Sequence, residues 1–289
     1  MFEQYTRRLE TERQDARGML VRTPRGALHV VIEGSGPDVV MIHGVTDNSA
    51  VWAGIQRELA GVARTHAIDL PGHGLSDIPL SPLSVAAMAD AVIAYMDMEN
   101  IRGAVVVGNS LGGGVSLGIA ARAKHRVRSV ILLGSIGTHF PIPPGLGLLR
   151  VLGVAETMAA ISRNPSMRRF VMRDLWHKSF VPSEEQLEHY WRGWRVGGRA
   201  RYIRALMRVM NVAEPGPWLA SIEAPVHVIH GDRDRIIPVR VAHELASAIR
   251  GATIEILPAT GHEPQIERPR ETIAAIRRAL ATSSPRAHV

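Results

Sequence analysis

Short apolar runs rich in β-branched residues begin near the start of the chain and are separated by proline and glycine. The first three lie at residues 19–22, 27–34 and 38–44. Runs of this length and composition, bounded by turn-forming residues, predict strands. We expect the first two strands to pair as a hairpin around residues 23–26. Residues 1–17 are mostly charged, with a few apolar residues at helical spacing, and predict a short surface helix or arm.

After His43 the pattern alternates between apolar runs and amphipathic stretches. Further strands are expected at 64–70, 103–109, 128–135, 225–232 and 252–258. Helices are expected at 84–98, 112–123, 238–249 and 268–280. Continuous valine and isoleucine runs that alternate with helices indicate a parallel sheet covered on both faces. The sequence therefore predicts the α/β class.

The alternation stops between residues 136 and 215, where helical patterns rich in Met, Trp and Arg replace the strands. This stretch holds twelve basic and six acidic residues, and so carries +6 of the net charge of +7. We interpret it as a helical cap inserted into the α/β core. The predicted organisation is a first core part at 1–135, which includes the arm at 1–17, a cap at 136–215 and a second core part at 216–289.

Composition narrows the class of protein. Hydrophobic residues make up 46% of the chain, yet no apolar run has the length of about 18 residues that a membrane-spanning helix needs. The start of the chain lacks a secretory pattern. There is no cysteine, which excludes disulfides and thiolate catalysis and fits a cytoplasmic location. Arginine is scattered along the chain and aromatics are only 4%, so we do not expect nucleic-acid binding in spite of the basic charge.

The sharpest chemical signal is Gly108-Asn109-Ser110-Leu111-Gly112, which lies between a predicted strand and a predicted helix. A strand that turns abruptly into a helix holds the residue at the bend in a strained conformation, and larger side chains two positions away would collide. Gly108 and Gly112 remove that collision. Ser110 is then exposed above the sheet at a helix N-terminus, which favours negative charge. We predict Ser110 as the nucleophile.

A serine nucleophile needs a base within hydrogen-bond reach. His262 follows the last predicted strand, and the strand before it is followed by two acids, Asp232 and Asp234. The order Ser, Asp, His along the chain is typical of serine hydrolases with a strand–Ser–helix bend. We predict His262 as the base and Asp234 as the acid that orients it, with Asp232 as the alternative, otherwise a residue that stabilises the loop.

An attacked carbonyl also needs two N–H donors for the developing oxyanion. One donor is expected to be the amide of Leu111. The other is expected from Val45, in the loop after the third strand, where Gly44 allows a close turn. We expect His43 to brace this loop through hydrogen bonds rather than take part in the chemistry.

Five ordered motifs resemble the α/β-hydrolase fold enzymes, in particular the capped serine esterases and the meta-cleavage-product hydrolases. The motifs are His43-Gly44 with Trp52 downstream, the DLPGHGLS segment at 69–76, the GNSLGG elbow, Gly231-x-x-Asp234-x-x-Ile237-Pro238 and Gly261-His262. The resemblance covers about residues 20–282, the cap excepted. It implies a mostly parallel sheet of eight strands with helices on both faces and an inserted cap, and it implies neither a metal nor another cofactor.

The nucleophile narrows the reaction. Epoxide hydrolases and haloalkane dehalogenases of this fold use a carboxylate at this position, whereas a serine suits acyl carbonyls. We therefore expect a carboxylic ester hydrolase, a serine esterase that works through an acyl-enzyme. The Asn109-Ser110 pair also resembles the carbon–carbon hydrolases, with Arg192 and Arg195 as candidates to hold a substrate carboxylate. Those enzymes usually carry Trp after the catalytic His, where this chain has Glu263. A ligand receptor of the same fold without turnover is the other alternative.

Large apolar residues in the predicted cap are candidates for the substrate pocket, namely Trp176, Trp191, Trp194 and Met207. The alternative is that they form the cap's own small core. The expected partner is a small, apolar ester substrate. The excess of arginine in the cap leaves open an attraction for anionic substrates. The chain is expected to be a monomer or a homodimer.

Overall fold

The computed structural model describes residues 17–81, 83–161, 164–195 and 197–282. Its centre is one eight-stranded sheet with the strand order β1-β2-β4-β3-β5-β6-β7-β8. The strands are β1 Met19–Thr23, β2 Gly26–Glu33, β3 Asp38–Ile42, β4 Arg64–Ile68, β5 Ala104–Asn109, β6 Val127–Leu133, β7 Val226–Gly231 and β8 Thr253–Leu257. The first two form the predicted antiparallel hairpin, β2 also pairs antiparallel with β4, and all later pairings are parallel. The mostly parallel α/β-hydrolase sheet is thus confirmed.

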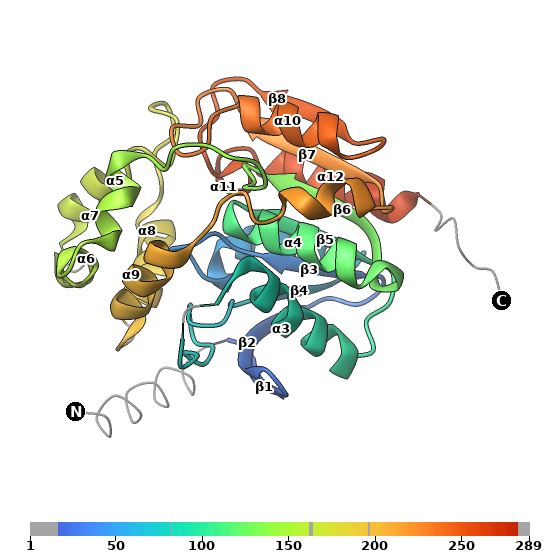
Figure 1. Cartoon of the computed structure of the whole chain (residues 1–289), viewed down its shortest axis with the longest axis horizontal. Helices are drawn as coiled ribbons and strands as arrows, with labels where there is room; N and C mark the ends of the chain where they lie inside the picture. The colour runs from blue at the N-terminus through green and yellow to red at the C-terminus, as the bar shows by residue number, and fades with distance from the viewer. Residues whose placement is uncertain (1–16, 82, 162–163, 196, 283–289) are drawn as a thin grey trace.

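Helices cover both faces of the sheet (Figure 1). In the core they are η1 Ser49–Trp52, α2 Ala53–Leu59, α3 Val85–Met98, α4 Leu111–Arg122, η2 Lys124–Arg126, η4 Gly216–Ser221, α10 Arg240–Ala248, α11 Pro264–Glu267 and α12 Pro269–Ala281. The helices that the sequence predicted correspond to α3, α4, α10 and α12. The short helices η1 and α2 were not predicted.

Alternation along the central strands divides the hydrophobic core in two. In β3, Val40 and Ile42 point to the core that α3, α4 and α10 complete. Val39 and Met41 point to the opposite core, which α2 and α12 cover. Successive strand residues face opposite sides, so a run that is apolar at every position must be buried on both. This sandwich holds the carboxyl ends of the parallel strands in a fixed arrangement, and the functional loops leave from these ends.

The region between β6 and β7 contains helices and, among its described residues, no strand. Its helices are α5 Pro144–Gly147, η3 Leu148–Arg150, α6 Val154–Ile161, α7 Pro165–Met172, α8 Glu184–Arg195 and α9 Arg199–Val209. Figure 1 shows α5 to α9 grouped to one side of the sheet. No single helix within the described ranges is long and apolar enough to cross a membrane, although α5–η3 and α6, bent by 107°, meet the length and composition criteria as a pair. The predicted N-terminal arm lies outside the described residues, apart from its last residue.

Candidate active site

Ser110 lies at the bend between β5 and α4, with φ 55° and ψ −116°. Positive φ is unfavourable for a residue with a side chain and persists only where the surrounding structure enforces it. The flanking glycines show what enforces it. A Cβ on Gly108 would lie 2.2 Å from the Gly112 carbonyl oxygen, and a Cβ on Gly112 would lie 2.2 Å from the Ile42 carbonyl oxygen. The bend is therefore too tight for any other residue at these two positions.

Asn109 fixes the elbow to its surroundings. Its side-chain Nδ2 donates to the carbonyl oxygens of Leu133, at 3.0 Å, and His262, at 3.1 Å. Gly44 packs against the same turn, because a Cβ there would lie 3.1 Å from Asn109 Oδ1 and 3.4 Å from Ser110 Cβ. The elbow, the loop after β3 and the loop that carries His262 thus meet at one edge of the sheet.

His262 and Asp234, 28 residues apart, form a buried pair. The His262 Nδ1 and the Asp234 Oδ2 are 2.8 Å apart. Asp234 Oδ1 accepts hydrogen bonds from the amides of Ile236 and Ile237 at 2.8 and 2.9 Å, which hold the carboxylate in place. Asp232 is exposed and lies 3.4 Å from the amide of Thr260. The structure therefore places Asp234, and not Asp232, against the imidazole.

The pair is electrostatically polarised. Burial alone would lower the pKa of His262, but the charge and hydrogen bond of Asp234 outweigh it and raise that pKa. Burial would likewise raise the pKa of Asp234, but the neighbouring imidazoles of His262 and His230 hold it well below its usual range. Asp234 stays ionised, and its charge stabilises a proton on His262.

His230 is a contact that the sequence analysis missed. It is fully buried at the end of β7, and its Nε2 lies 2.9 Å from the Ile237 carbonyl oxygen and 3.2 Å from Asp234 Oδ2. The second interaction adds a donor to the carboxylate. The available signal was a histidine four residues before the acid, at the carboxyl end of a buried strand.

Ser110 and His262 lie on adjoining loops, but their side chains are not hydrogen-bonded. Ser110 Oγ makes no hydrogen bond with another described residue. The backbone contact from Asn109 to His262 places the two loops side by side. At Gly134, a Cβ would lie within 3.3 Å of both Asp234 Oδ2 and His262 Nδ1, so the pair sits directly above the end of β6, the strand beside the elbow.

The predicted oxyanion donors share a pocket with Ser110. Val45 and Leu111 line it, and the backbone amides of both make no hydrogen bond with any residue that the structure describes. His43 is fully buried: its Nδ1 lies 2.7 Å from the Gly44 carbonyl oxygen, and its Nε2 accepts from the amide of Leu70 at 3.0 Å. Both ring nitrogens are occupied, so His43 is placed as a brace for the loop.

A small pocket lies at Ser110. Apart from Ser110, the described residues that line it are hydrophobic and come from several segments far apart in the sequence: Val45, Leu111, Ile136, Phe140, Ile142, Leu146, Met210, Val212, Ile236 and Ile237. None of the four large cap residues proposed for substrate binding is among them. Phe140, Ile142 and Leu146 were not predicted from the sequence, because only the folded chain brings this segment to the elbow.

Those four residues occupy other positions. Trp176 donates its indole N–H to Glu263 at 2.7 Å, and Trp194 donates its own to the Thr46 carbonyl oxygen at 2.9 Å. Trp191 is buried with its ring centroid 5.7 Å from that of Trp194. Met207 is fully buried. The side chains of Arg192 and Arg195 lie outside the described part of the chain.

No group of three or more His, Asp or Glu side chains in the described ranges is arranged to hold a metal ion. A hydroxyl at a helix N-terminus, two unpaired amides and a buried imidazole–carboxylate pair are the groups that acyl transfer uses.

Residues 37–269 match the family of the alpha/beta hydrolase fold. The chain belongs to this family. It is 32% identical over 251 residues to a 2-hydroxymuconate semialdehyde hydrolase of a Pseudomonas species, covering 81% of this chain and 83% of that protein. It is 27% identical to a pimeloyl-(acyl-carrier protein) methyl ester esterase of Nitrosomonas europaea, covering 86% of this chain and 97% of the esterase.

The fold is also that of solved structures. A meta-cleavage product hydrolase from Pseudomonas fluorescens superposes with a TM-score of 0.77 at 21% identity, over 91% of this chain and 97% of that one. The relatives of this α/β hydrolase therefore include enzymes named for ester cleavage and enzymes named for cleavage of meta-cleavage products.

Proposed function

We propose that this α/β hydrolase is a carboxylic ester hydrolase that works through an acyl-enzyme on Ser110. The observation that carries the proposal is the strained serine at the strand–helix bend, on the loop beside the buried His262–Asp234 pair. Glycine adopts a positive φ with less strain than serine, so packing alone would favour a glycine between Gly108 and Gly112. Strain of this kind is typical of a functional position.

The mechanism follows from the positions of the groups. His262 Nε2, opposite the nitrogen that faces Asp234, takes the proton of the Ser110 hydroxyl as its oxygen attacks the ester carbonyl. The amides of Val45 and Leu111 stabilise the oxyanion, and protonated His262 then donates its proton to the leaving alcohol. A water molecule activated by His262 hydrolyses the acyl-enzyme and restores Ser110. Asp234 keeps the proton of the neutral imidazole on Nδ1 and stabilises the imidazolium.

The pocket at Ser110 supports a short apolar acyl group as the substrate part bound there. Among the described residues that line it, all except Ser110 are hydrophobic and none is charged. We propose Phe140, Ile142 and Leu146 as acyl contacts in place of the four cap residues expected from the sequence. Residues 136–215 are proposed to act as the cap that excludes water from this pocket. The mechanism requires no cofactor, and the cytoplasm is the location we propose.

The test compares hydrolysis of p-nitrophenyl acetate and p-nitrophenyl butyrate by the wild type and by Ser110→Ala. The proposal predicts turnover by the wild type and none above background in the variant, with unchanged thermal unfolding. Unchanged turnover in the alanine variant would remove Ser110 from the mechanism. Absence of turnover in both proteins would contradict esterase activity.

Cleavage of a carbon–carbon bond is the second candidate, and the 32% identity to a 2-hydroxymuconate semialdehyde hydrolase favours it. The substrate of that enzyme is tested directly by following its absorbance with the wild type. Efficient consumption that is lost in Ser110→Ala, with weak ester turnover, would replace the first proposal with this one. The side chains that the structure describes around the Ser110 pocket are uncharged and instead support the ester, because a carboxylate substrate needs a cationic or hydrogen-bonding partner.

A further inference from the structure

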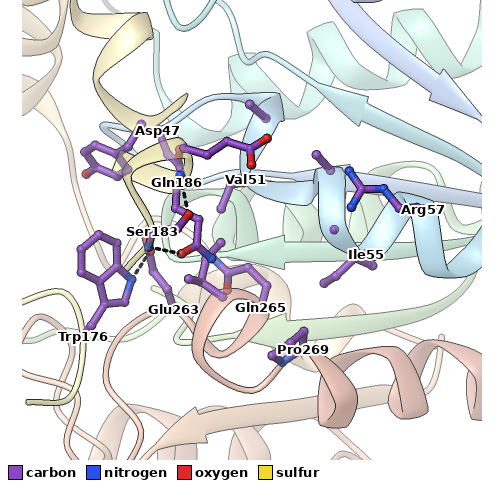
Figure 2. A pocket seen from close by; sticks show the side chains of 16 residues that line it. Asp47, Val51, Ile55, Arg57, Trp176, Ser183, Gln186, Glu263, Gln265 and Pro269 are labelled. Carbon is purple, nitrogen blue, oxygen red and sulfur yellow. Dashed lines mark hydrogen bonds between the residues drawn. The ribbon is translucent and has the colours of Figure 1, made fainter. Parts of the chain in front are cut away.

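A larger pocket adjoins the oxyanion loop. Val45 lines the pocket at Ser110, and Asp47, two residues further along the same loop, lines this second pocket. Glu263, the neighbour of His262 in the chain, lines it as well. It is much larger than the pocket at Ser110. Figure 2 shows its side chains, which come from the segment after β3, from the 176–190 region and from the start of α11 and α12.

Two carboxyl groups line this pocket although they are almost completely buried. Asp47 is 5% exposed and Glu263 is 3% exposed. One oxygen of Glu263 accepts the indole N–H of Trp176, and one oxygen of Asp47 accepts the amide of Asn48 at 2.8 Å. Asp47 Oδ2 has no hydrogen-bond partner among the described residues. Burying two acids together is costly unless a cation or a proton compensates them.

The electrostatics reflect that cost. Burial and then the charge of Glu263 raise the pKa of Asp47 well above its ordinary range. Burial raises the pKa of Glu263 to about 7. For both groups, burial outweighs the hydrogen bonds that stabilise the charged form, from Trp176 to Glu263 and from the Asn48 amide to Asp47.

Gln265 is an independent sign of an unfilled site. It is 2% exposed and lines the same pocket, yet both its Oε1 and its Nε2 lack a hydrogen-bond partner among the described residues. Buried side-chain amides in native proteins are nearly always bonded, so an amide with neither atom satisfied points to a missing partner. Asp47 Oδ2 and Gln265 Oε1 are thus two unsatisfied acceptors beside the Glu263 carboxyl group, and Gln265 Nε2 is an unsatisfied donor that can face one of the two carboxyl groups.

The chemistry of these groups selects the ligand. The acceptors need N–H donors on a positive charge, and a primary ammonium group supplies three such donors. The rings of Trp176 and Tyr190 also line the pocket and can face a cation. Arg57, a basic residue of the lining, is exposed and forms no ion pair with either acid. We propose that this pocket binds a primary alkylammonium group, with Asp47, Glu263 and Gln265 as its polar contacts.

The position of the pocket links it to the reaction. Asp47 and Glu263 flank the oxyanion loop and the catalytic histidine, so a bound ammonium group lies next to the place where the acyl group reacts. The corresponding substrate class is an ester that carries an amine. This link rests on the proposed function, whereas the ammonium site itself does not.

Binding of the ammonium group requires ionised carboxylates, so it strengthens as pH rises through the raised pKa of Glu263, about 7, and through the raised pKa of Asp47. Butylamine stays protonated at this pH because alkylamines, like lysine, have a pKa of about 10.4. Other titratable groups surround Glu263. The charge of His262 lowers its pKa, and the charges of Glu267 and Asp234 raise it. Asp47 and Tyr190 face it as well.

The test measures binding of n-butylamine by calorimetry in an amine-free phosphate buffer, with 1-butanol as the neutral probe of the same shape. The proposal predicts that the wild type binds butylamine at least about tenfold more tightly than butanol. Asp47→Asn and Glu263→Gln should each weaken butylamine binding about tenfold or more. Glu58→Gln removes a negative charge from an exposed residue of α2 outside the pocket lining, and should bind as the wild type does.

Three results would overturn the proposal. The first is equal affinity for butylamine and butanol, and the second is unchanged butylamine affinity in both Asp47→Asn and Glu263→Gln. The third is that Mg²⁺ or Ca²⁺ alone occupies the site and prevents butylamine from binding. Thermal unfolding checks that each variant folds. If one does not, the wild type still decides, because its affinity for butylamine must rise between about pH 6 and about pH 8.

Ser110→Ala separates this proposal from the proposed function. The variant should bind butylamine as tightly as the wild type, whether or not the wild type hydrolyses esters. Loss of ester turnover with no butylamine binding in either protein would leave the esterase proposal intact and refute the ammonium site alone. Butylamine binding without any ester turnover would do the reverse.

Discussion

Asp234→Asn isolates the carboxylate behind the proposed base. The substitution keeps the shape of the side chain but replaces one oxygen with an NH₂ group. The amides of Ile236 and Ile237 both donate to Oδ1, so the remaining carbonyl oxygen is held at that position. The NH₂ group must then face His262 Nδ1, which becomes an acceptor. The imidazole is forced into the tautomer with its proton on Nε2, and that nitrogen can no longer accept the proton of Ser110.

The expected loss follows from this tautomer change. In the serine-protease triad the same substitution lowers kcat by about 10⁴, which corresponds to about 5.5 kcal/mol of barrier. We expect kcat for p-nitrophenyl butyrate to fall by about 10³ to about 10⁴, with little change in KM, because Asp234 does not line the acyl pocket.

The pH profile supplies a second readout. Protonated His262 cannot act as a base, so wild-type kcat/KM falls as pH drops through a pKa above the ordinary value of 6.5. In the variant, burial still lowers the pKa of His262 while the opposing charge of Asp234 is gone. The acidic limb of the residual activity should therefore move to lower pH.

Asp232→Asn is the matched control, since it makes the same chemical change two residues away on an exposed side chain. Its kcat should stay within about twofold of the wild type, because surface substitutions rarely cost more than about 0.5 kcal/mol. The assay is initial-rate hydrolysis from about pH 5 to about pH 9, with thermal unfolding of each variant. Full activity in Asp234→Asn, or a large loss in Asp232→Asn, would refute the assignment.

Two further substitutions probe the elbow and the pocket. Gly112→Ala puts a Cβ 2.2 Å from the Ile42 carbonyl oxygen and should lower the free energy of unfolding in urea by about 1 to about 3 kcal/mol. Gly61→Ala, with open space around it, should leave that free energy nearly unchanged. Equal stability of the two variants would contradict the tight elbow. Leu146→Trp fills the pocket at Ser110 and should reduce turnover of the butyrate ester more than turnover of the acetate ester. Leu148→Trp, at an exposed position nearby, should leave the butyrate-to-acetate ratio of turnover unchanged. An equal change of this ratio in both variants would contradict the acyl pocket.

The sheet and the elbow were predictable because local sequence determines them. Val105 and Val107 face one core while Val106 faces the other, so β5 has to be apolar at every position, and this makes the run visible in the sequence. The requirement for Gly108 and Gly112 is also local, since backbone atoms close to the bend exclude a Cβ at both positions.

The pocket and its neighbours were not predictable because they depend on long-range packing. Hydrophobicity marked Trp176 and Trp194 as pocket candidates, but each instead directs its indole N–H to a distant acceptor, Glu263 or the Thr46 carbonyl oxygen. In the sequence, Glu263 is only the residue that stands where carbon–carbon hydrolases usually carry Trp. The fold shows that it is buried beside Asp47. His230 looks like one more residue of a buried strand until β7 places it against Asp234.

The most direct test of the central claim is covalent. The protein is incubated with a fluorophosphonate, which reacts with serines activated by a neighbouring base, and the adduct is located by mass spectrometry. A single adduct on Ser110 that is absent from Ser110→Ala and forms far more slowly in Asp234→Asn is the predicted result. An adduct on a different residue, with Ser110 unlabelled in the folded protein, would contradict the account.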